Sequence, residues 1–321
     1  MLKRQYLIIA IPVYNDWGSL AILLREINHV AANRDLHLHV VIIDDGSTQS
    51  CSMIREEVQG LIHIERIIVL HLACNLGHQK AIALGLAYIN KNFKFDQVIV
   101  MDSDGEDRPD DILRLLDEHR QSPNAIIFGR RTRRSEDRIF RFFYVLYKIG
   151  FRLLTGAEIS FGNFALIPAQ MLKRIVYLPE IWNHFAAGII RSRLPWQALS
   201  TTRGRRYSGQ SKMNFVSLIV HGMSAISVFI EILTVRLILG SLAIILLGVL
   251  GFIALLYIKY FTTLAIPGWA TSVAIGLVLV MFQAVILLSL LTFMVLNYRA
   301  NKLFIPVKDY ADYFFGVERL R

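Results

Sequence analysis

Three carboxylates at alternate positions follow a short apolar run, and together they could hold a divalent cation. The run Val98–Met101 is rich in β-branched residues and predicts a buried strand, which Asp102, Asp104 and Glu106 follow. Because alternate residues of an extended segment point the same way, Asp102 and Asp104 can face one ion. Mg²⁺ and Mn²⁺ take oxygen ligands and bridge to phosphates, so the pattern predicts a metal that carries a phosphorylated ligand. A polar loop that caps the next helix is the plainer interpretation.

Two earlier apolar runs also end in polar loops. Leu7–Ile11 is followed by Pro12-Val13-Tyr14-Asn15-Asp16, and Val40–Ile43 is followed by Asp44-Asp45-Gly46-Ser47. Asp-Gly is common turn chemistry, so a simple turn after the second run is a serious alternative. Carboxylates at the ends of successive parallel strands would nevertheless meet at one edge of a sheet, where open α/β sheets bind ligands.

Alternating strand and helix patterns position these loops. Further strands are predicted at Ile67–Leu70 and Ala125–Phe128. Apolar residues at helical spacing predict the intervening helices, which lie around Leu20–Ile27, Ala81–Leu86 and Ile112–Leu116. This alternation predicts an α/β fold with a mostly parallel sheet and helices on both faces. The chain contains neither a Gly-x-Gly-x-x-Gly dinucleotide fingerprint nor a P-loop.

Hydropathy separates a soluble part from a membrane part. Hydrophobic residues make up 54% of the 321 residues, and the mean hydropathy is +0.45, too apolar for an ordinary soluble domain. The excess lies after Arg236: residues 237–258 contain no charge, and neither do residues 260–298, where a helix is expected over Trp269–Leu296. Each stretch can cross the roughly 30 Å hydrocarbon core, so two C-terminal transmembrane helices are predicted.

Basic residues predict the orientation of these helices. Arg236 precedes the first span, Arg299 and Lys302 follow the second, and the connecting loop offers only Lys259. The positive-inside rule then places the sheet domain and both termini in the cytoplasm, in a multi-pass protein of the inner (cytoplasmic) membrane. The first apolar run is too short for a signal peptide. Charge-free spans argue against a transport path built by one chain and leave a homo-oligomer open.

Charge and cysteine content narrow the partners and the compartment. The net charge of +10 is concentrated in arginines beside apolar segments, which favours phosphates and lipid headgroups over nucleic acid. Cys51 and Cys74 lack the spacing of a metal motif, and we expect two ordinary reduced residues.

Two amphipathic segments predict helices in the plane of the membrane. Residues 137–154 interleave aromatic and aliphatic side chains with cations, although a helix packed on the sheet would have a similar pattern. Residues 213–234 are a second apolar segment. The expected organisation is therefore a sheet domain over residues 1–212, an interfacial helix over 213–234, two transmembrane helices over 235–298 and a cytoplasmic tail over 299–321.

Four segments together resemble family 2 glycosyltransferases of the GT-A fold. They are, in order, Pro12–Asp16, Asp44–Ser47, Asn75–Ala81 and Asp102–Glu106. The resemblance covers roughly the first 130 residues. It implies a GT-A, Rossmann-like domain that takes a sugar from a nucleotide-sugar donor. In that family the first two loops hold the nucleotide, and the Asp-x-Asp holds the metal bound to its diphosphate.

The matching positions imply roles for particular residues. Nucleotide-sugar contacts are expected from Pro12, Tyr14, Asp16, Asp44, Asp45, Lys80 and Asp102. Ligands for Mg²⁺ or Mn²⁺ are expected from Asp102, Asp104 and Glu106. Glu106 departs from relatives similar to dolichol-phosphate mannosyltransferases, which often carry Gln there. Asp104 and Arg131 are the expected catalytic residues.

A basic segment carries the resemblance further. The segment Arg203–Lys212 resembles the Arg-x-x-Gly-x-Ser-Lys segment of polyprenyl-phosphate glycosyltransferases. With the membrane helices, it implies undecaprenyl phosphate on the cytoplasmic leaflet as acceptor. Contacts to the acceptor phosphate are expected from Arg131, Arg134, Arg138, Arg206 and Lys212. Since a phosphate monoester has its second pKa near 6, it attacks without a catalytic base, and the resemblance implies inversion at the anomeric carbon.

Two alternatives remain open at this point. One is another lipid or glycan acceptor, although the Gln-x-x-Arg-Trp motif of processive synthases is missing. The other is a catalytically silent membrane scaffold, because Gly162–Leu166 lacks the arginine that relatives carry in this region. The presence of Asp102 and Asp104 speaks against loss of activity. The sequence leaves open the sugar, and whether the donor carries UDP or GDP.

Overall fold

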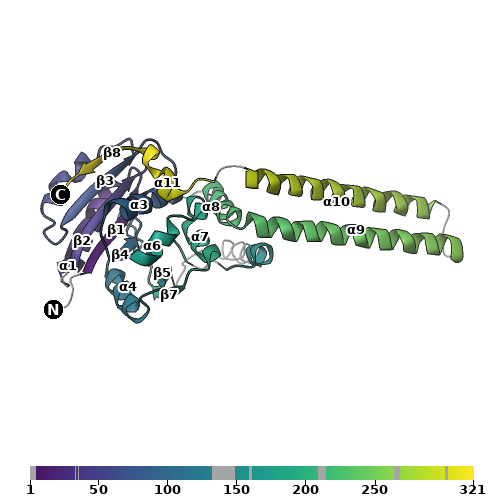
Figure 1. The fold of residues 1–321 in the computed structure, drawn as a ribbon, viewed down its shortest axis with the longest axis horizontal. Helices are drawn as coiled ribbons and strands as arrows, with labels where there is room; N and C mark the ends of the chain where they lie inside the picture. Colours follow the sequence, from purple (N-terminus) through teal and green to yellow (C-terminus); the bar gives the residue numbers. More distant parts are fainter. Residues whose placement is uncertain are drawn as a thin grey trace. The chain divides into compact units, whose positions relative to one another are not determined.

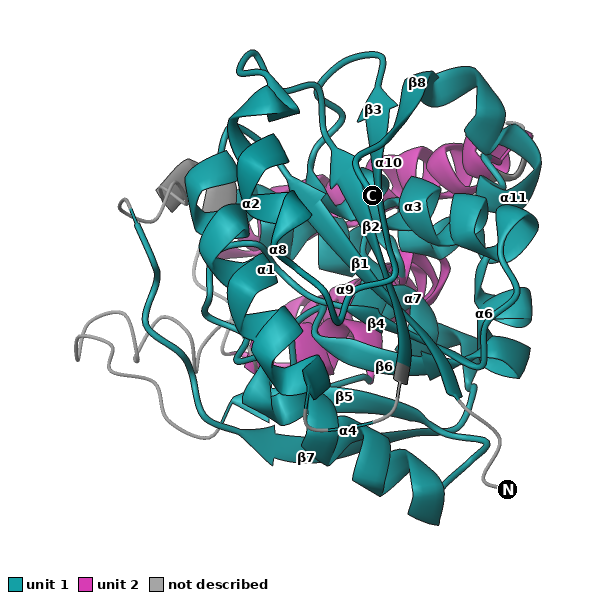
Figure 2. Cartoon of the chain, turned by 90° about the vertical axis from the view of Figure 1, so that its left-hand side faces the viewer, with its two compact units in different colours: residues 1–146, 157–228, 304–321 teal, residues 147–156, 229–303 magenta. Residues whose placement is uncertain are grey.

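The computed structural model describes residues 5–32, 34, 36–131, 149–158, 161–208, 215–263, 268–300 and 303–321. The chain forms two compact units, which Figure 2 shows in different colours. Unit 1 comprises residues 1–146, 157–228 and 304–321, and unit 2 comprises residues 147–156 and 229–303. Unit 1 contains the sheet, and unit 2 contains two long helices.

The described part of unit 1 is built on an eight-stranded sheet (Figure 1). In spatial order the strands are β7 (Trp196–Thr201), β5 (Ile126–Arg131), β6 (Ala165–Pro168), β4 (Gln97–Val100), β1 (Gln5–Val13), β2 (Leu36–Asp44), β3 (Arg66–Leu72) and β8 (Phe314–Arg319). Strands β4, β1, β2 and β3 are parallel, as are β5 and β7, whereas β6 and β8 run antiparallel to their neighbours. The predicted mostly parallel sheet is confirmed, and all five predicted strands lie in it.

Helices cover both faces of this sheet (Figure 2). One face packs against α1 (Trp17–Ala32), α4 (Asp110–Gln121), η1 (Cys51–Ile54) and α2 (Arg55–Gln59). The other packs against α3 (His78–Asn92), α6 (Ala169–Ile175), η2 (Pro179–Trp182), α7 (Phe185–Ser192) and α11 (Pro306–Asp309). Alternate residues of β1 divide between the two cores: Ile9 and Ile11 enter the first, and Ile8 and Ala10 enter the second.

The C-terminal segment completes the sheet rather than forming the expected tail. After α11 and η3 (Tyr310–Tyr313), β8 pairs antiparallel with β3, so that Glu318 lies opposite Val69. Ile67 extends the pairing through backbone hydrogen bonds with Leu320 and Arg321. Strand β1 also continues two residues beyond its expected end, with Pro12 opposite Ile43. Both differences arise because pairing with a neighbouring strand, and not the local apolar run, sets where a strand ends.

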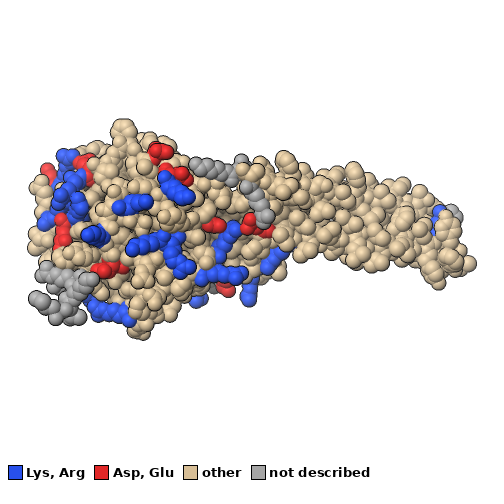
Figure 3. All heavy atoms as spheres, in the orientation of Figure 1, with Lys and Arg blue, Asp and Glu red and all other residues tan. Residues whose placement is uncertain are grey.

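Unit 2 consists mainly of α9 (Ile230–Phe261) and α10 (Trp269–Ala300), which run antiparallel side by side (Figure 1). Both helices are long and apolar enough to cross a membrane, as predicted. On the face drawn in Figure 3, charged side chains gather over unit 1, and α9 and α10 show almost none between their ends. The helices pack through small residues: a Cβ at Gly248 would lie 2.5 Å from Met281 Cγ.

The amphipathic segments are described in part. Helix α8 (Phe215–Ser227) falls within the predicted segment 213–234, and α9 begins three residues after it ends. Within the predicted helix 137–154, residues 149–154 are helical, and residues 137–148 lie outside the described residues. The expectation that these helices lie in a membrane interface stays a prediction.

Candidate active site

The polar loops after β1, β2 and β3 are joined to one another at the carboxyl edge of the sheet. The Asn15 side chain accepts hydrogen bonds from the backbone N–H groups of Thr48 and Gln49, at 2.9 and 3.2 Å. The Asp45 carboxylate accepts from the N–H groups of Leu76 and Gly77, at 2.8 and 3.0 Å. Burial raises the pKa of Asp45, although these two hydrogen bonds oppose that effect. The three loops therefore form one connected edge, which we call the donor rim.

The loop after β4, residues 102–107, carries four carboxylates and binds three arginines. We call it the acid loop. Glu106 binds Arg131 at 3.0 Å through one oxygen and Arg203 at 2.6 Å through the other. Arg131 also binds Asp107 at 3.0 Å, and Arg206 binds Asp104 at 2.6 Å. Acidic and basic groups thus alternate in one network at the ends of β4 and β5.

Within the acid loop, the pKa values of neighbouring carboxylates are shifted in opposite directions. Burial and the neighbouring Asp102 raise the pKa of Asp107 to about 7, despite its contact with Arg131. Burial also acts to raise the pKa of Glu106, but Arg203 and Arg131 outweigh it and the pKa is lowered. Closely spaced carboxylates repel one another, and the arginines compensate for part of that repulsion.

Asp102 connects the acid loop to α3. Its Oδ1 lies 3.2 Å from Nε2 of His78, the first residue of that helix. Burial opposes the charge on Asp102, but His78 together with the nearby arginines holds its pKa below the usual value. Asn163, from the segment whose role the sequence leaves open, lies 2.9 Å from the same His78 nitrogen.

Asp102 fits the predicted cation better than Asp104 or Glu106 does, because both oxygens of Asp104 are held, one by Arg206 and the other by the backbone N–H of Glu106. Oδ1 of Asp102 is buried and pairs with His78 Nε2 at 3.2 Å without meeting hydrogen-bond geometry, so this oxygen can still take a cation. Both oxygens of Glu106 are already bound by arginines. Among the described residues, the acid loop does not form a group of three ligand atoms within 4.8 Å of one another.

A second loop, residues 203–207, packs directly on the acid loop. The N–H groups of Gly204 and Tyr207 donate to the carbonyl oxygens of Glu106 and Asp104, at 2.9 and 3.0 Å. Gly105 has φ +83°, and a Cβ on Gly204 would overlap its carbonyl oxygen. The approach therefore requires glycine in both loops. Beside them lies an open cleft of about 620 Å³, whose lining includes Arg205 and Arg206.

The structure brings some predicted residues together and separates others. Asp102, Asp104, Glu106, Arg131 and Arg206 lie in one network. The remaining donor residues are Pro12, Tyr14, Asp16, Asp44, Asp45 and Lys80. All of these except Lys80 lie on or beside the donor rim. Tyr14 is exposed there, and Pro12 is buried in β1.

Two of the residues predicted to contact the donor already contact other residues of the chain. Lys80 Nζ lies over the ring of Trp182, 5.1 Å from its centroid. Asp44 accepts from the N–H of Ser47 at 2.9 Å and contacts His71. The predicted acceptor residues Arg134, Arg138 and Lys212 lie outside the described residues.

Three residues of the network were not singled out by the sequence. His78 lies within the motif Asn75–Ala81, Asp107 ends the acidic run and Arg203 begins the basic segment that leads to Lys212. Each of these residues lies in or next to a motif of the sequence. Only the folded chain shows that these residues contact the Asp-x-Asp segment.

Known proteins resemble this chain over most of its length. A Bacillus subtilis protein named uncharacterized glycosyltransferase YkcC is 27% identical over 296 residues, which cover 89% of this chain and 86% of that protein. The undecaprenyl-phosphate 4-deoxy-4-formamido-L-arabinose transferase of Photorhabdus laumondii is 26% identical over 225 residues, covering 66% of this chain and 64% of that protein.

A solved structure and a family comparison agree with the fold. Mannosyl-3-phosphoglycerate synthase from Rubrobacter xylanophilus superposes with a TM-score of 0.51 at 13% identity, covering 70% of this chain and 72% of that chain, a likeness of fold alone. The pattern of glycosyl transferase family 2 matches residues 8–176, more than half of the chain. The chain therefore belongs to glycosyl transferase family 2.

Proposed function

We propose that this glycosyltransferase moves a sugar from a UDP- or GDP-sugar to undecaprenyl phosphate, on the cytoplasmic leaflet of the membrane. The observation that carries the proposal is the network of Arg131, Arg203 and Arg206 around the acid loop. It offers guanidinium groups for phosphate beside carboxylates for a cation. The helices that could span a membrane and the acceptor named in the Photorhabdus relative support a lipid phosphate.

The donor would lie along the donor rim and end at the acid loop. Tyr14, which is 42% exposed beside the rim, would contact the nucleoside. Asp102 and Asp104 would hold Mg²⁺ or Mn²⁺. Such a cation supplies positive charge to the diphosphate that leaves the sugar. His78 keeps the Asp102 carboxylate oriented, because it lies 3.2 Å from one of its oxygens.

The arginines would bind and align the acceptor. Guanidinium groups bind phosphate through paired N–H donors, and Arg131 already presents two nitrogens toward the acid loop. An acceptor oxygen forms the new bond to the anomeric carbon, and the bond from that carbon to the diphosphate breaks. The nucleoside diphosphate departs with the electron pair. Because the acceptor phosphate is largely dianionic at pH 7, no protein base is needed, and attack opposite the leaving group inverts the carbon.

Arg131→Ala tests this assignment in the full-length protein. The KM for undecaprenyl phosphate should rise about 10-fold or more, as expected for lost charge-assisted hydrogen bonds, and donor affinity should change by less than about 3-fold. Arg130→Ala is the matched control, since Arg130 precedes it on β5 and is exposed. Loss of donor affinity with an unchanged dependence on lipid would overturn the assignment of Arg131 to the acceptor.

A further inference from the structure

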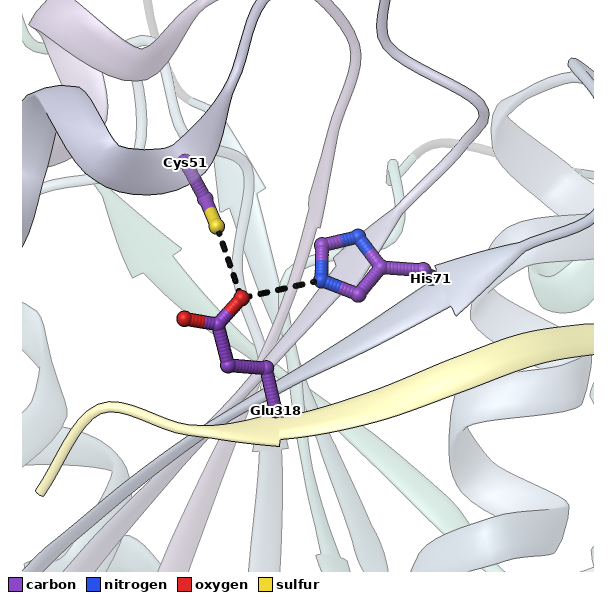
Figure 4. Close-up of side chains that lie close together, drawn as sticks. All are labelled: Cys51, His71 and Glu318. Carbon is purple, nitrogen blue, oxygen red and sulfur yellow. Dashed lines mark hydrogen bonds and ion pairs between the residues drawn. The ribbon is translucent and has the colours of Figure 1, made fainter.

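Cys51, His71 and Glu318 meet at one place in unit 1 although they are far apart in the sequence. They come from η1, β3 and β8, and their side chains point toward one another (Figure 4). Glu318 Oε2 lies 3.2 Å from Cys51 Sγ and 3.6 Å from His71 Nε2. Among the described residues, this is the group of three metal-type ligands whose atoms all lie within 4.8 Å of one another.

The types of ligand favour zinc over a hard cation. Zn²⁺ binds thiolate at about 2.3 Å, imidazole nitrogen at about 2.0 to 2.1 Å and carboxylate at about 2.0 to 2.2 Å, in tetrahedral geometry. Such bond lengths place neighbouring ligand atoms roughly 3.3 to 3.6 Å apart. The two separations from Glu318 Oε2 are close to these values. Mg²⁺ and Ca²⁺ prefer oxygen ligands alone.

The second nitrogen of His71 supplies an independent observation. Nδ1 lies 2.8 Å from Oδ2 of Asp44, a carboxylate that is only 5% exposed and is held in place by the N–H of Ser47. An Nδ1–H group that donates to Asp44 leaves the Nε2 lone pair directed at Glu318. Without a metal, the Cys51 thiol donates to Glu318 Oε2, and a cation that displaces this proton would be bound by all three side chains. A carboxylate on the outer nitrogen is also the usual partner of a metal-binding histidine.

The two carboxylate oxygens of Glu318 contact different residues. Oε1 binds Arg55, whose side chain is 61% exposed, and Oε2 faces Cys51 and His71. A cation at Oε2 therefore does not require the arginine to leave. Cys51 is buried, whereas the side chains of His71 and Glu318 are 25% and 30% exposed, which leaves room for a water ligand.

We propose that Cys51 Sγ, His71 Nε2 and Glu318 Oε2 bind one Zn²⁺, with a water molecule as fourth ligand and Asp44 supporting His71. On binding, the thiol proton leaves to solvent. The ion joins β8 to β3 and η1, and so fixes the segment that follows α10 to the edge of the sheet. Because Asp44 also belongs to the donor rim, the zinc site lies next to the proposed nucleotide site.

Cobalt substitution tests the proposal in the full-length, detergent-solubilised protein. After treatment with a chelator, the protein is titrated with Co²⁺, which gives a thiolate charge-transfer band only when a cysteine is a ligand. We expect one thiolate-bound Co²⁺ per chain, displaced by Zn²⁺. The chain contains two cysteines, and Cys74 is exposed and lies outside the group, so Cys74→Ser is the matched control. It should retain the band, and Cys51→Ser should lose it.

Two further variants test the zinc site even if Cys51→Ser does not fold. Glu318→Gln preserves shape and should weaken Co²⁺ binding at least 10-fold, whether or not Cys51→Ser folds. Asp104→Asn should leave the band unchanged, which separates this site from the acid loop. A wild-type protein without the band, loss of the band in Cys74→Ser, or unchanged affinity in Glu318→Gln would overturn the proposal. None of these readouts depends on glycosyl transfer, so the zinc site and the proposed function are tested separately.

Discussion

Burial and two neighbouring carboxylates make the charged form of Asp104 unfavourable. Burial and Asp102 raise its pKa, and the backbone N–H of Glu106 and the guanidinium of Arg206 oppose this. The chain therefore keeps a carboxylate where its charge is costly, close enough to Asp102 for the two charges to repel each other. Stability alone does not favour such an arrangement, whereas cation binding does.

Asp104→Asn keeps the side chain's shape and removes its charge. Since loss of an outer-sphere partner of a metal costs about 10- to 100-fold, loss of a direct ligand should reduce transfer at least ~100-fold. Folding should be little affected, because the substitution removes the repulsion from Asp102 together with the ion pair to Arg206. The measurement is the rate of product formation against Mg²⁺ concentration. Asp117→Asn is the control, since Asp117 is an exposed residue of α4 that binds Arg34. Wild-type turnover by Asp104→Asn would remove this carboxylate from the metal site.

His184 makes stability depend on pH. Burial and His221 lower its pKa to about 3, and its Nδ1 accepts from the N–H of Ala187 at the start of α7. An unfolded histidine titrates near 6.5, so below about pH 6.5 the unfolded chain binds a proton that the folded chain excludes. This contribution is fully present above that pH. It is lost as pH falls toward 3, by at most about 1.4 kcal/mol per unit.

His184→Asn should abolish this dependence, because asparagine also caps a helix and does not titrate. The measurement is the thermal midpoint of both proteins at about pH 7.5 and about pH 5.5, on either side of the unfolded pKa. We expect the midpoint of the wild type to fall more than that of the variant. Equal decreases would mean that His184 is not the group responsible.

At the scale of elements, the acid loop depends on its contact with residues 203–207. Gly204→Ala would push the two loops apart, because its Cβ meets backbone rather than a flexible side chain. Arg203 and Arg206 would then lose their places at Glu106 and Asp104, and a displacement of about 1 Å costs roughly 100-fold in rate.

Transfer rates and melting curves measure this effect. Gly18→Ala is the matched control, since a Cβ there on α1 meets nothing within 4 Å. It should leave activity unchanged and stabilise the helix by roughly 0.5 to 1 kcal/mol. Gly204→Ala with full activity would show that the contact between the loops does not position the arginines.

Elements defined by long apolar or periodic runs could be predicted from the sequence, and short paired strands could not. Strands β1 to β5 and helices α1, α3 and α4 each carry their own hydrophobic pattern. Strand β6 has four residues and β7 is largely exposed, so neither leaves a clear period. Strand β8 contains Gly316 and forms only by pairing with β3, a contact that no local pattern encodes.

The same limit applies to the sites. The Asp-x-Asp segment and Arg131 lie close together in the chain and were predicted, whereas Arg203 reaches Glu106 only through the fold. The group of Cys51, His71 and Glu318 lacks motif spacing because its third member comes from the C-terminal strand. Spacing rules detect sites whose ligands lie within one motif, and this group joins three separate elements.

At the scale of the whole molecule, the positive-inside rule predicts a short outer hairpin between α9 and α10. A chain with Cys51→Ser and Cys74→Ser would carry Thr263→Cys, just beyond the end of α9. A membrane-impermeant maleimide should label it in intact spheroplasts. A chain in which exposed Cys74 is the sole cysteine should be labelled only after lysis. The reverse pattern would invert the topology.

Product formation tests the central claim most directly. Full-length protein is incubated with Mg²⁺ or Mn²⁺, a panel of UDP- and GDP-sugars, and either undecaprenyl phosphate or undecaprenol, and the lipids are analysed by mass spectrometry. We predict a glycosyl-phosphate lipid from one donor, with undecaprenyl phosphate alone. Transfer to undecaprenol, or donor hydrolysis with no lipid product, would contradict the proposed acceptor, and failure to turn over any donor would contradict glycosyl transfer by this chain.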